Sequence, residues 1–215
     1  MKVLVTGTSS GIGKGIAEEF LNNGDFVIGM DICPSAIANE NYRHLNVDIL
    51  KSDLPEIEGV EILVNNAGVQ ESGNDIDINL KGTMRVTEKY AFQDKIKSVV
   101  FIASASGNTG AEFPEYAASK GGMIAYMKNV ALRLAKYGAT SNSLSPGGVI
   151  TELNKHILDD PKLWEAVLNE ALLHRWADVE EIAKWTYFVA KINKSMTAQD
   201  ILIDNGEAAR SNFIW

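Results

Sequence analysis

Residues 6–13 read Thr6-Gly7-Thr8-Ser9-Ser10-Gly11-Ile12-Gly13, and this glycine-rich stretch decides the fold. It follows a short apolar run that we predict to be a strand, and it opens a segment with helical periodicity. Dinucleotide binding requires this context, because the backbone must approach a pyrophosphate closely at the positive end of a helix dipole. Taken alone, the stretch could equally be a flexible turn. A P-loop is excluded, because Lys14 is followed by Gly15 instead of serine or threonine.

Short apolar runs rich in valine and isoleucine recur along the chain and alternate with segments of helical periodicity. We predict strands over residues 2–6, 26–31, 43–47, 60–64, 97–103, 139–144 and 199–204, and helices over residues 11–22, 75–92, 114–136 and 178–191. Between residues 47 and 60 there is room for only a turn or two of helix. Alternation of this kind indicates a parallel sheet with helices on both faces. The predicted fold class is α/β, a Rossmann-like doubly wound parallel sheet of about seven strands in three α/β/α layers.

The bulk composition narrows the class of protein. With 215 residues, 46% hydrophobic and 22% charged, the chain suits one globular domain, which we expect to span residues 1–215. A net charge of -8 would repel a phosphate backbone, so nucleic acid is not an expected partner. Cys33 is the only cysteine, which excludes an intramolecular disulfide and fits a reducing compartment. No apolar run approaches the roughly 18 residues of a membrane span, so we expect a soluble, cytoplasmic protein without a membrane partner.

Polar residues follow several predicted strands. Asp31 ends the second strand about twenty residues after the glycine turn, where a carboxylate can accept hydrogen bonds from both hydroxyls of an adenosine ribose. A 2'-phosphate there would meet like charge, so Asp31 favours NAD(H) over NADP(H); a plain turn-forming aspartate is the alternative. Asp48 follows the third strand, and Asn65-Asn66-Ala67-Gly68 follows the fourth. Because ligands of open sheets bind at carboxyl strand ends, these residues are cofactor-site candidates.

Tyr116 and Lys120 are four residues apart on a predicted helix, so their side chains share one face. An ammonium beside a phenol stabilises the phenolate and lowers the phenol pKa toward the range useful for proton transfer. The same spacing occurs at Tyr187 and Lys191, so one pair must be incidental. Ser104 lies twelve residues before Tyr116, at the end of a predicted strand. We therefore assign the first pair to the chemistry and interpret the second as part of a core-facing helix.

Together these residues resemble the short-chain dehydrogenase/reductase family in its compact, single-domain form, over essentially the whole chain. The segments that match its motifs are Thr6 to Gly13, Asn65 to Gly68, Asn79 within Ile78-Asn79-Leu80, Ser104 with Gly107, Tyr116-Ala117-Ala118-Ser119-Lys120, and Pro146-Gly147 with Thr151. In this order and spacing the motifs are very specific. The segment after Gly68 is shorter than the family's usual one, which puts the family's usual tetramer in doubt.

The resemblance implies a role for each of four residues. Tyr116 would be the general acid toward a carbonyl oxygen in reduction and the base in oxidation, and Lys120 would lower its pKa and bind the nicotinamide ribose. Ser104 would hold the substrate oxygen, and Asn79 would support a water that relays protons to Lys120. The implied cofactor contacts are Gly7, Ser9, Ser10, Gly11, Ile12, Gly13, Asp31, Ile32, Asp48, Ile49, Asn66, Ala67, Gly68, Tyr116, Lys120, Pro146, Gly147, Val149 and Thr151.

The expected function is hydride transfer between NAD(H) and a secondary alcohol or ketone, by a homodimer or homotetramer. Two alternatives stay open: an NADPH-dependent 3-oxoacyl-thioester reductase, and a non-catalytic dinucleotide-sensing protein on the same fold. Titrating both cofactors would separate the first alternative from the expected function. A pure sensor would not need the proton-handling residues Asn79, Ser104, Tyr116 and Lys120.

The least regular segment, residues 151–173, is expected to form a substrate lid. The substrate itself cannot be identified from the sequence; Glu112, Glu115 and Glu152 hint at a polar or cationic one. We expect no metal, because the three histidines show no ligand spacing, and we expect the four tryptophans to fill cores or interfaces. The apolar segment 212–215 is expected to pack on a partner subunit or near the lid.

Overall fold

The computed structural model describes residues 1–111 and 113–209, and these build one seven-stranded sheet of parallel strands in the order β3-β2-β1-β4-β5-β6-β7. This confirms the predicted doubly wound α/β fold. The strands are β1 (Lys2–Thr6), β2 (Phe26–Asp31), β3 (Tyr42–Asn46), β4 (Ile62–Asn65), β5 (Ser98–Ile102), β6 (Thr140–Pro146) and β7 (Asp200–Ile203). Each lies within one or two residues of its predicted limits.

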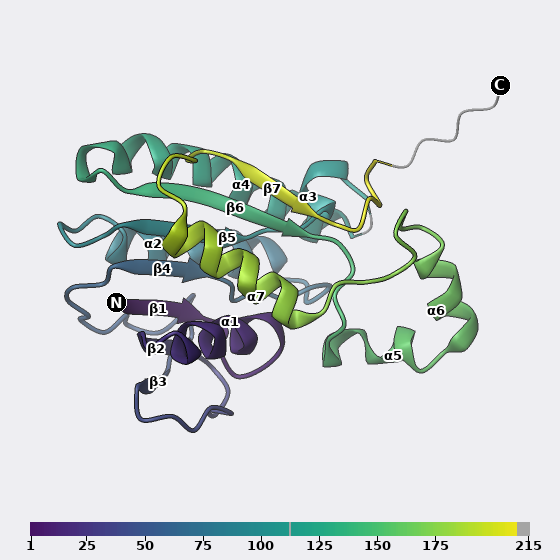
Figure 1. The fold of residues 1–215 in the computed structure, drawn as a ribbon, viewed down its shortest axis with the longest axis horizontal. Coiled ribbons are helices and arrows are strands. Elements are labelled where there is room, and N and C mark those ends of the chain that lie inside the picture. The colour runs from purple at the N-terminus through teal and green to yellow at the C-terminus, as the bar shows by residue number, and fades with distance from the viewer. Residues whose placement is uncertain (112, 210–215) are drawn as a thin grey trace.

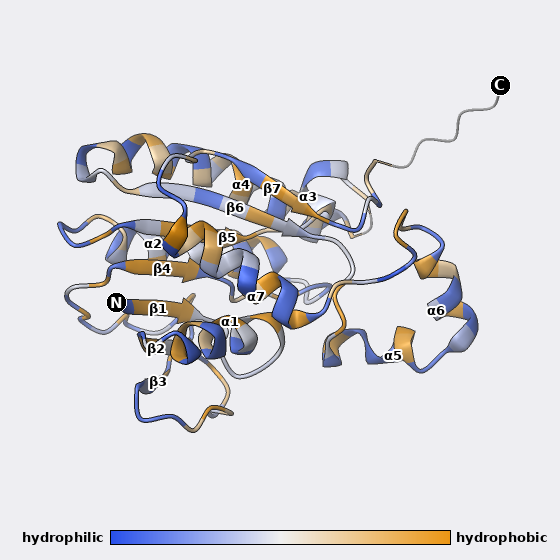
Figure 2. Ribbon diagram, in the orientation of Figure 1, coloured by the Kyte–Doolittle hydropathy of each residue, from blue (hydrophilic) through white to orange (hydrophobic). Residues whose placement is uncertain are grey.

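Helices cover both faces of the sheet (Figure 1). On one face lie α1 (Gly11–Asn22) and α7 (Val179–Tyr187), whose apolar residues pack with Val3, Val5 and Val64 from the strands. On the other lie α2 (Thr83–Tyr90) and α4 (Pro114–Leu134), which pack with Leu4 and Leu63. Figure 2 shows the matching pattern, with apolar strands in the middle layer and helices that are apolar on one side only.

The strand order reverses between β1 and β4. From β1 the chain proceeds outward through β2 to β3, and from β4 it proceeds outward in the other direction to β7. At such a reversal the two connections leave a crevice outside the carboxyl ends of the strands, which is where open α/β sheets bind ligands. The glycine turn after β1 and the Asn-Asn-Ala-Gly turn after β4 therefore meet at one place.

Two predicted helices are less regular than their periodicity indicated. The segment predicted over 75–92 is a π-helix, η1 (Ile76–Gly82), followed by α2, and the last predicted helix continues from α7 into a second π-helix, η4 (Phe188–Ile192). The helix predicted over 114–136 ends with a 3-10 turn, η2 (Ala135–Tyr137). Residues 47–61 contain turns and no helix, although the sequence left room for a turn or two of helix in this connection. A π-helix widens one turn, and such turns are frequent at functional sites.

Four short helices complete the fold: α3 (Ser106–Thr109) after β5, and η3 (Glu152–Asn154), α5 (Lys155–Leu158) and α6 (Pro161–Leu168) within the expected lid segment. Figure 1 shows α5 and α6 projecting beyond the carboxyl ends of the strands. Of the described helices, none is both long and apolar enough to cross a membrane. The prediction for residues 212–215 falls outside the described residues.

Candidate active site

The glycine turn after β1 is built by close packing of backbone. Gly7 has a φ of +75, and a Cβ on it would lie 2.8 Å from the Asn66 amide nitrogen. A Cβ on Gly13 would lie 1.9 Å from the Gly7 carbonyl oxygen, so only glycine lets α1 begin this close to the turn. Gly11 differs, because the nearest atom to its Cβ position is a Thr151 methyl at 3.8 Å. The open side of the turn, where a phosphate could approach the start of α1, is therefore at Gly11.

Asp31, at the end of β2, is fixed beside this turn. One of its carboxylate oxygens accepts a hydrogen bond from the Ser9 backbone N–H at 3.0 Å, and the other accepts one from the Cys33 N–H at 2.8 Å. Ile32, the next residue, is 66% exposed. The carboxylate thus stands between the glycine turn and the turn after β2, with an exposed apolar side chain next to it. This arrangement suits an adenosine, with the carboxylate toward the ribose and the apolar side chain toward the adenine ring.

The turns after β3 and β4 place the remaining predicted cofactor residues. The Asp48 carboxylate accepts hydrogen bonds from the N–H groups of Leu50 and Lys51, and the buried Ile49 side chain packs against Gly82. Any contact from Ile49 to a cofactor would therefore be through its backbone. Asn66 donates from its amide to the carbonyl oxygens of Thr6 and Gly7, which ties the turn after β4 to the glycine turn.

A cavity of about 550 Å³ lies next to these turns, at the carboxyl ends of the strands. Ser104, Tyr116 and Lys120 line it together. Nine of the predicted cofactor residues line it as well: Ile12, Asn66, Gly68, Tyr116, Lys120, Pro146, Gly147, Val149 and Thr151. Asn79 is fully buried and does not line the cavity. The other predicted cofactor residues lie in the glycine turn itself, in the turns after β2 and β3, and at Ala67 in the turn after β4.

Lys120 is a buried cation in the cavity wall. It is 4% exposed, its ammonium donates to the Ile102 carbonyl oxygen at 2.9 Å, and it lies 5.6 Å from the centre of the Tyr116 ring. Burial lowers the Lys120 pKa to about 8, and the negative charge of Asp75 opposes that shift. An ammonium that holds its proton this weakly at the side of a phenol is suited to exchanging protons near neutral pH.

Ser104 is brought to this pair by the turn from β5 into α3. Its hydroxyl accepts a hydrogen bond from the Ser106 N–H at 3.2 Å, and the residue is 8% exposed. A Cβ on Gly107 would lie 2.8 Å from the Lys120 carbonyl carbon, so the glycine lets α3 pack directly on α4. The distance between the serine and the Tyr116–Lys120 pair is therefore set by a backbone contact.

Asn79, the middle residue of η1, acts through hydrogen bonds behind the cavity. Its amide nitrogen donates to the Val69 carbonyl oxygen at 2.8 Å and to the Ser119 hydroxyl at 3.0 Å, while its oxygen accepts from the Val69 N–H at 2.8 Å. The Ser119 hydroxyl donates in turn to the Tyr116 carbonyl oxygen at 2.7 Å. Ser119, which the sequence reasoning did not single out, thus links Asn79 to the helix turn that carries Tyr116.

The far wall of the cavity contains residues that no motif indicated. It includes His156, Val167, Glu170 and Trp176. Trp176 packs against Gly148, where a Cβ would lie 2.2 Å from the indole. It also packs edge-to-face with Trp164 of α6, with the ring centres 5.2 Å apart. These two tryptophans, expected to fill cores or interfaces, pack the lid segment against the cavity wall. Pocket walls built from irregular segments carry little sequence signal, because their spacing follows no helix or strand period.

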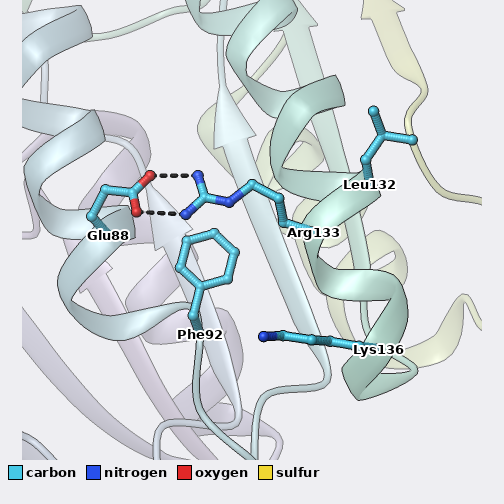
Figure 3. A pocket seen from close by; sticks show the side chains of 5 residues that line it. All are labelled: Glu88, Phe92, Leu132, Arg133 and Lys136. Atoms are coloured by element: carbon cyan, nitrogen blue, oxygen red, sulfur yellow. Dashed lines mark hydrogen bonds and ion pairs between the residues drawn. The ribbon is translucent and has the colours of Figure 1, made fainter.

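A second surface hollow, between α2 and α4, is lined by Glu88, Phe92, Leu132, Arg133 and Lys136 (Figure 3). Both guanidinium nitrogens of Arg133 bind the Glu88 carboxylate at 2.6 Å, and the guanidinium lies 3.9 Å from the Phe92 ring centre. These charges satisfy each other, and the hollow lies away from the predicted site residues. Among the described residues, no group of three or more histidine, cysteine, aspartate or glutamate side chains could hold a metal ion.

Comparisons with known proteins agree with this architecture. A family model described as enoyl-(acyl carrier protein) reductase matches residues 7–207. The chain is 32% identical to the 3-oxoacyl-(acyl-carrier-protein) reductase FabG of Vibrio cholerae, over 94% of this chain and 95% of that protein.

Two solved structures show how far the likeness extends in space. A short chain dehydrogenase family protein from Francisella tularensis superimposes with a TM-score of 0.83 at 27% identity, over 97% of this chain and 99% of that one. A 4-hydroxyisoleucine dehydrogenase mutant, solved in complex with NADH and succinate, superimposes with a TM-score of 0.86 at 25% identity, over 99% of this chain and 100% of that one. Both likenesses extend over nearly the whole of this chain.

Proposed function

Because this chain belongs to the short-chain dehydrogenase/reductase family, we propose that it is an NAD(H)-dependent oxidoreductase acting on a secondary alcohol or ketone. The observation that carries the proposal is the meeting of Ser104, Tyr116 and Lys120 on one cavity that also reaches the glycine turn. A dinucleotide-sensing protein would need the turn and the cavity but not a weakly basic lysine buried beside a tyrosine. We propose that the whole chain, residues 1–215, forms this one catalytic domain, with residues 151–173 as the lid.

The residues present fit a nicotinamide dinucleotide. Gly11 leaves the start of α1 open to a pyrophosphate, and Asp31 offers a carboxylate to the adenosine ribose. Pro146, Gly147 and Thr151 would hold the nicotinamide end, where they line the cavity opposite Tyr116. When bound, this cofactor supplies or accepts the hydride.

Tyr116 handles the proton in this proposal. In reduction its phenol donates a proton to the substrate oxygen, and in oxidation its phenolate takes that proton back. The Lys120 ammonium, 5.6 Å from the ring centre, stabilises the phenolate by its charge. Ser104 donates a hydrogen bond to the substrate oxygen, where negative charge develops in reduction. Asn79 supports the water that returns protons to Lys120, from the widened turn of η1.

Turnover and cofactor preference can be tested together. A panel of sugars, polyols, hydroxy acids, steroids and their ketones is assayed by the absorbance of NADH, and in parallel with NADPH. We expect turnover with at least one secondary alcohol or ketone and tighter binding of NADH than of NADPH. The variant Asp31→Ser should weaken NADH binding by roughly tenfold and narrow the difference between the two cofactors. Tighter binding of NADPH by the wild type would contradict the role proposed for Asp31.

A second candidate is reduction of a 3-oxoacyl thioester with NADPH, which the printed function of the Vibrio cholerae relative favours. Against it, Lys120 is the only lysine or arginine among the described residues that line the cavity, and it belongs to the proton-handling pair. An acyl carrier with a phosphate group would find no other cation there. Acetoacetyl-CoA with NADPH is the direct test, and turnover above that of every alcohol or ketone in the panel would favour this candidate.

We further propose that the protein forms a homodimer or homotetramer in which the β7 edge of the sheet is one interface. β7 ends the strand order, and large apolar side chains stand exposed beside it on Trp185, Phe188, Ile192 and Leu202. Such a patch on a soluble surface is usually covered. Sedimentation velocity should show a dimer or a tetramer for the wild type and a smaller species for Phe188→Glu. An unchanged assembly in that variant would place the interface elsewhere.

A further inference from the structure

The loop between Gly68 and η1 is short, and it folds back onto the carboxylate of Asp75. This side chain is 1% exposed, and it accepts hydrogen bonds from the Glu71 N–H at 2.9 Å, the Ser72 N–H at 2.9 Å and the Ser72 hydroxyl at 2.6 Å. Three donors therefore converge on one buried carboxylate. That number is typical of a carboxylate that stays ionised inside a protein.

Asn79 holds the other end of the same loop. It lies about one helical turn after Asp75, and its amide binds both the N–H and the carbonyl oxygen of Val69. Val69, Gln70 and Ser72 line the cavity. The loop that forms this part of the cavity wall is thus fastened at both ends by side chains from the first turns of η1.

The loop that Asp75 fastens begins against the catalytic pair, because a Cβ on Gly68 would lie 3.5 Å from the Lys120 ammonium nitrogen. The Asp75 charge also acts on that ammonium. Burial alone would raise the pKa of the Asp75 carboxyl, but hydrogen bonds from Ser72 and Glu71 and the attraction of the Lys120 ammonium hold it below its usual value. Asp75 is the source of negative charge that opposes the effect of burial on Lys120. The other titratable groups facing this cavity are Tyr116, His156, Glu170 and Glu207, whereas the Asp77 carboxylate pairs with Lys81.

We propose that Asp75 is a positioning residue of the active site: its buried carboxylate fastens the loop over residues 69–72 and keeps Lys120 in its ammonium form. The proposal rests on the proposed function, since it assigns Asp75 to the Tyr116–Lys120 pair. Lys120 stabilises a phenolate only while it is charged. Because Lys120 is buried, the negative charge of Asp75 acts on it strongly and extends to higher pH the range over which Lys120 stays protonated.

The test follows the titration of Lys120 directly. The protein is labelled with 13C at the lysine Cε, and the Lys120 signal is identified by its loss in Lys120→Met. We expect the signal to titrate near pH 8 in the wild type and roughly one pH unit lower in Asp75→Asn. Asp77→Asn, on the neighbouring exposed carboxylate, is the matched control and should leave the titration in place. Asp75→Glu keeps the charge, so in this variant the Lys120 signal should titrate within about half a pH unit of its wild-type value.

A second readout separates the charge from the loop contacts. Ser72→Ala removes one hydrogen bond to Asp75 but leaves its charge, so amide hydrogen exchange over residues 69–75 should accelerate while the Lys120 titration stays. An Asp75→Asn titration equal to that of the wild type would overturn the proposal. If Asp75→Asn does not fold, Asp75→Ser removes the charge with a smaller side chain and carries the same expectation. These measurements use the free protein, so a chain with no oxidoreductase activity would still give a result for Lys120.

Discussion

Two tyrosine–lysine pairs with the same spacing lie at opposite ends of the strands. Tyr116 and Lys120 stand on α4 at the cavity, and Tyr187 and Lys191 stand where α7 passes into η4. Each ammonium lies beside its own tyrosine ring, at 5.6 Å from the ring centre in the first pair and 5.1 Å in the second. The spacing thus produces the same local geometry twice, and only the surroundings differ.

The two lysines have opposite electrostatic surroundings. Lys191 binds both oxygens of the buried Asp25 carboxylate at 2.8 and 2.7 Å. Burial lowers the Lys191 pKa less than the Asp25 and Tyr187 contacts raise it, so its pKa stays above the usual value. Lys120 binds a neutral carbonyl oxygen, and burial brings its pKa to about 8. A lysine with a carboxylate partner is a structural cation, whereas one without a direct partner can exchange its proton.

The tyrosines differ in the same way. Tyr187 packs against Phe20 of α1 with ring centres 5.3 Å apart, which makes it part of the core, as the sequence predicted. Its neighbours Trp185 and Phe188 point away from the core and are both 44% exposed. Tyr116 instead faces the cavity. A spacing motif therefore predicts which side chains can meet, and the elements packed around them decide what the pair can do.

The largest expected effect distinguishes the two tyrosines by activity. Tyr116→Phe removes the proposed acid and base, so kcat should fall at least about 100-fold, with NADH binding retained. Tyr187→Phe removes the same oxygen from the other pair and should change kcat by no more than about twofold. Steady-state assays on the substrate found in the panel, with NADH binding followed by fluorescence, measure both. Equal activity in the two variants would contradict the assignment of proton transfer to Tyr116 and not to Tyr187.

The next effect distinguishes the two lysines by the sign of a stability change. The Lys120 pKa is lowered from 10.5 to about 8 in the folded protein. Below pH 8 the buried lysine is charged, and the free energy of unfolding is reduced by the full cost of burying that charge. Between pH 8 and 10.5 the unfolded chain binds more protons, and stability rises with pH. Lys120→Met should therefore stabilise the protein at pH 7 by about 2 kcal/mol: the pKa shift corresponds to roughly 3 kcal/mol, and loss of the Ile102 hydrogen bond offsets about 1 kcal/mol. The gain should vanish above pH 10.5.

Lys191→Met should have the opposite sign. It leaves the Asp25 carboxylate buried with the Met1 ammonium as its remaining cation, and we expect a loss of about 2 kcal/mol. Urea unfolding of both variants at pH 7, and of Lys120→Met again at pH 9.5, measures these changes. Destabilisation by both substitutions would mean that the charged Lys120, like Lys191, stabilises the folded protein.

The parallel sheet and the cluster of polar strand ends could be predicted from the sequence because each depends on local patterns. Strand runs, the glycine turn and the spacing from Ser104 to Tyr116 all have fixed periods or contexts. The roles of the individual glycines could not be separated, because Gly13 is required by its contact with Gly7, and that contact exists only after folding. Ser119 and Asp75 were missed for the same reason, since their partners lie on other elements.

The smallest effect concerns the anion of the structural pair. Asp25 precedes β2, at the amino ends of the strands and far from the cavity, so Asp25→Asn should leave kcat and NADH binding at wild-type values. Its side chain is 2% exposed, whereas those of Lys191 and Met1 are 24% and 17% exposed, so both cations can be hydrated once the charge is gone. Because the asparagine leaves no buried charge behind, we expect a loss of about 1 kcal/mol, less than in Lys191→Met. Urea unfolding at pH 7 ranks the two variants, with the exposed Asp77→Asn as the control. A larger loss in Asp25→Asn than in Lys191→Met would show that the Met1 contact, and not the lysine, dominates this cluster.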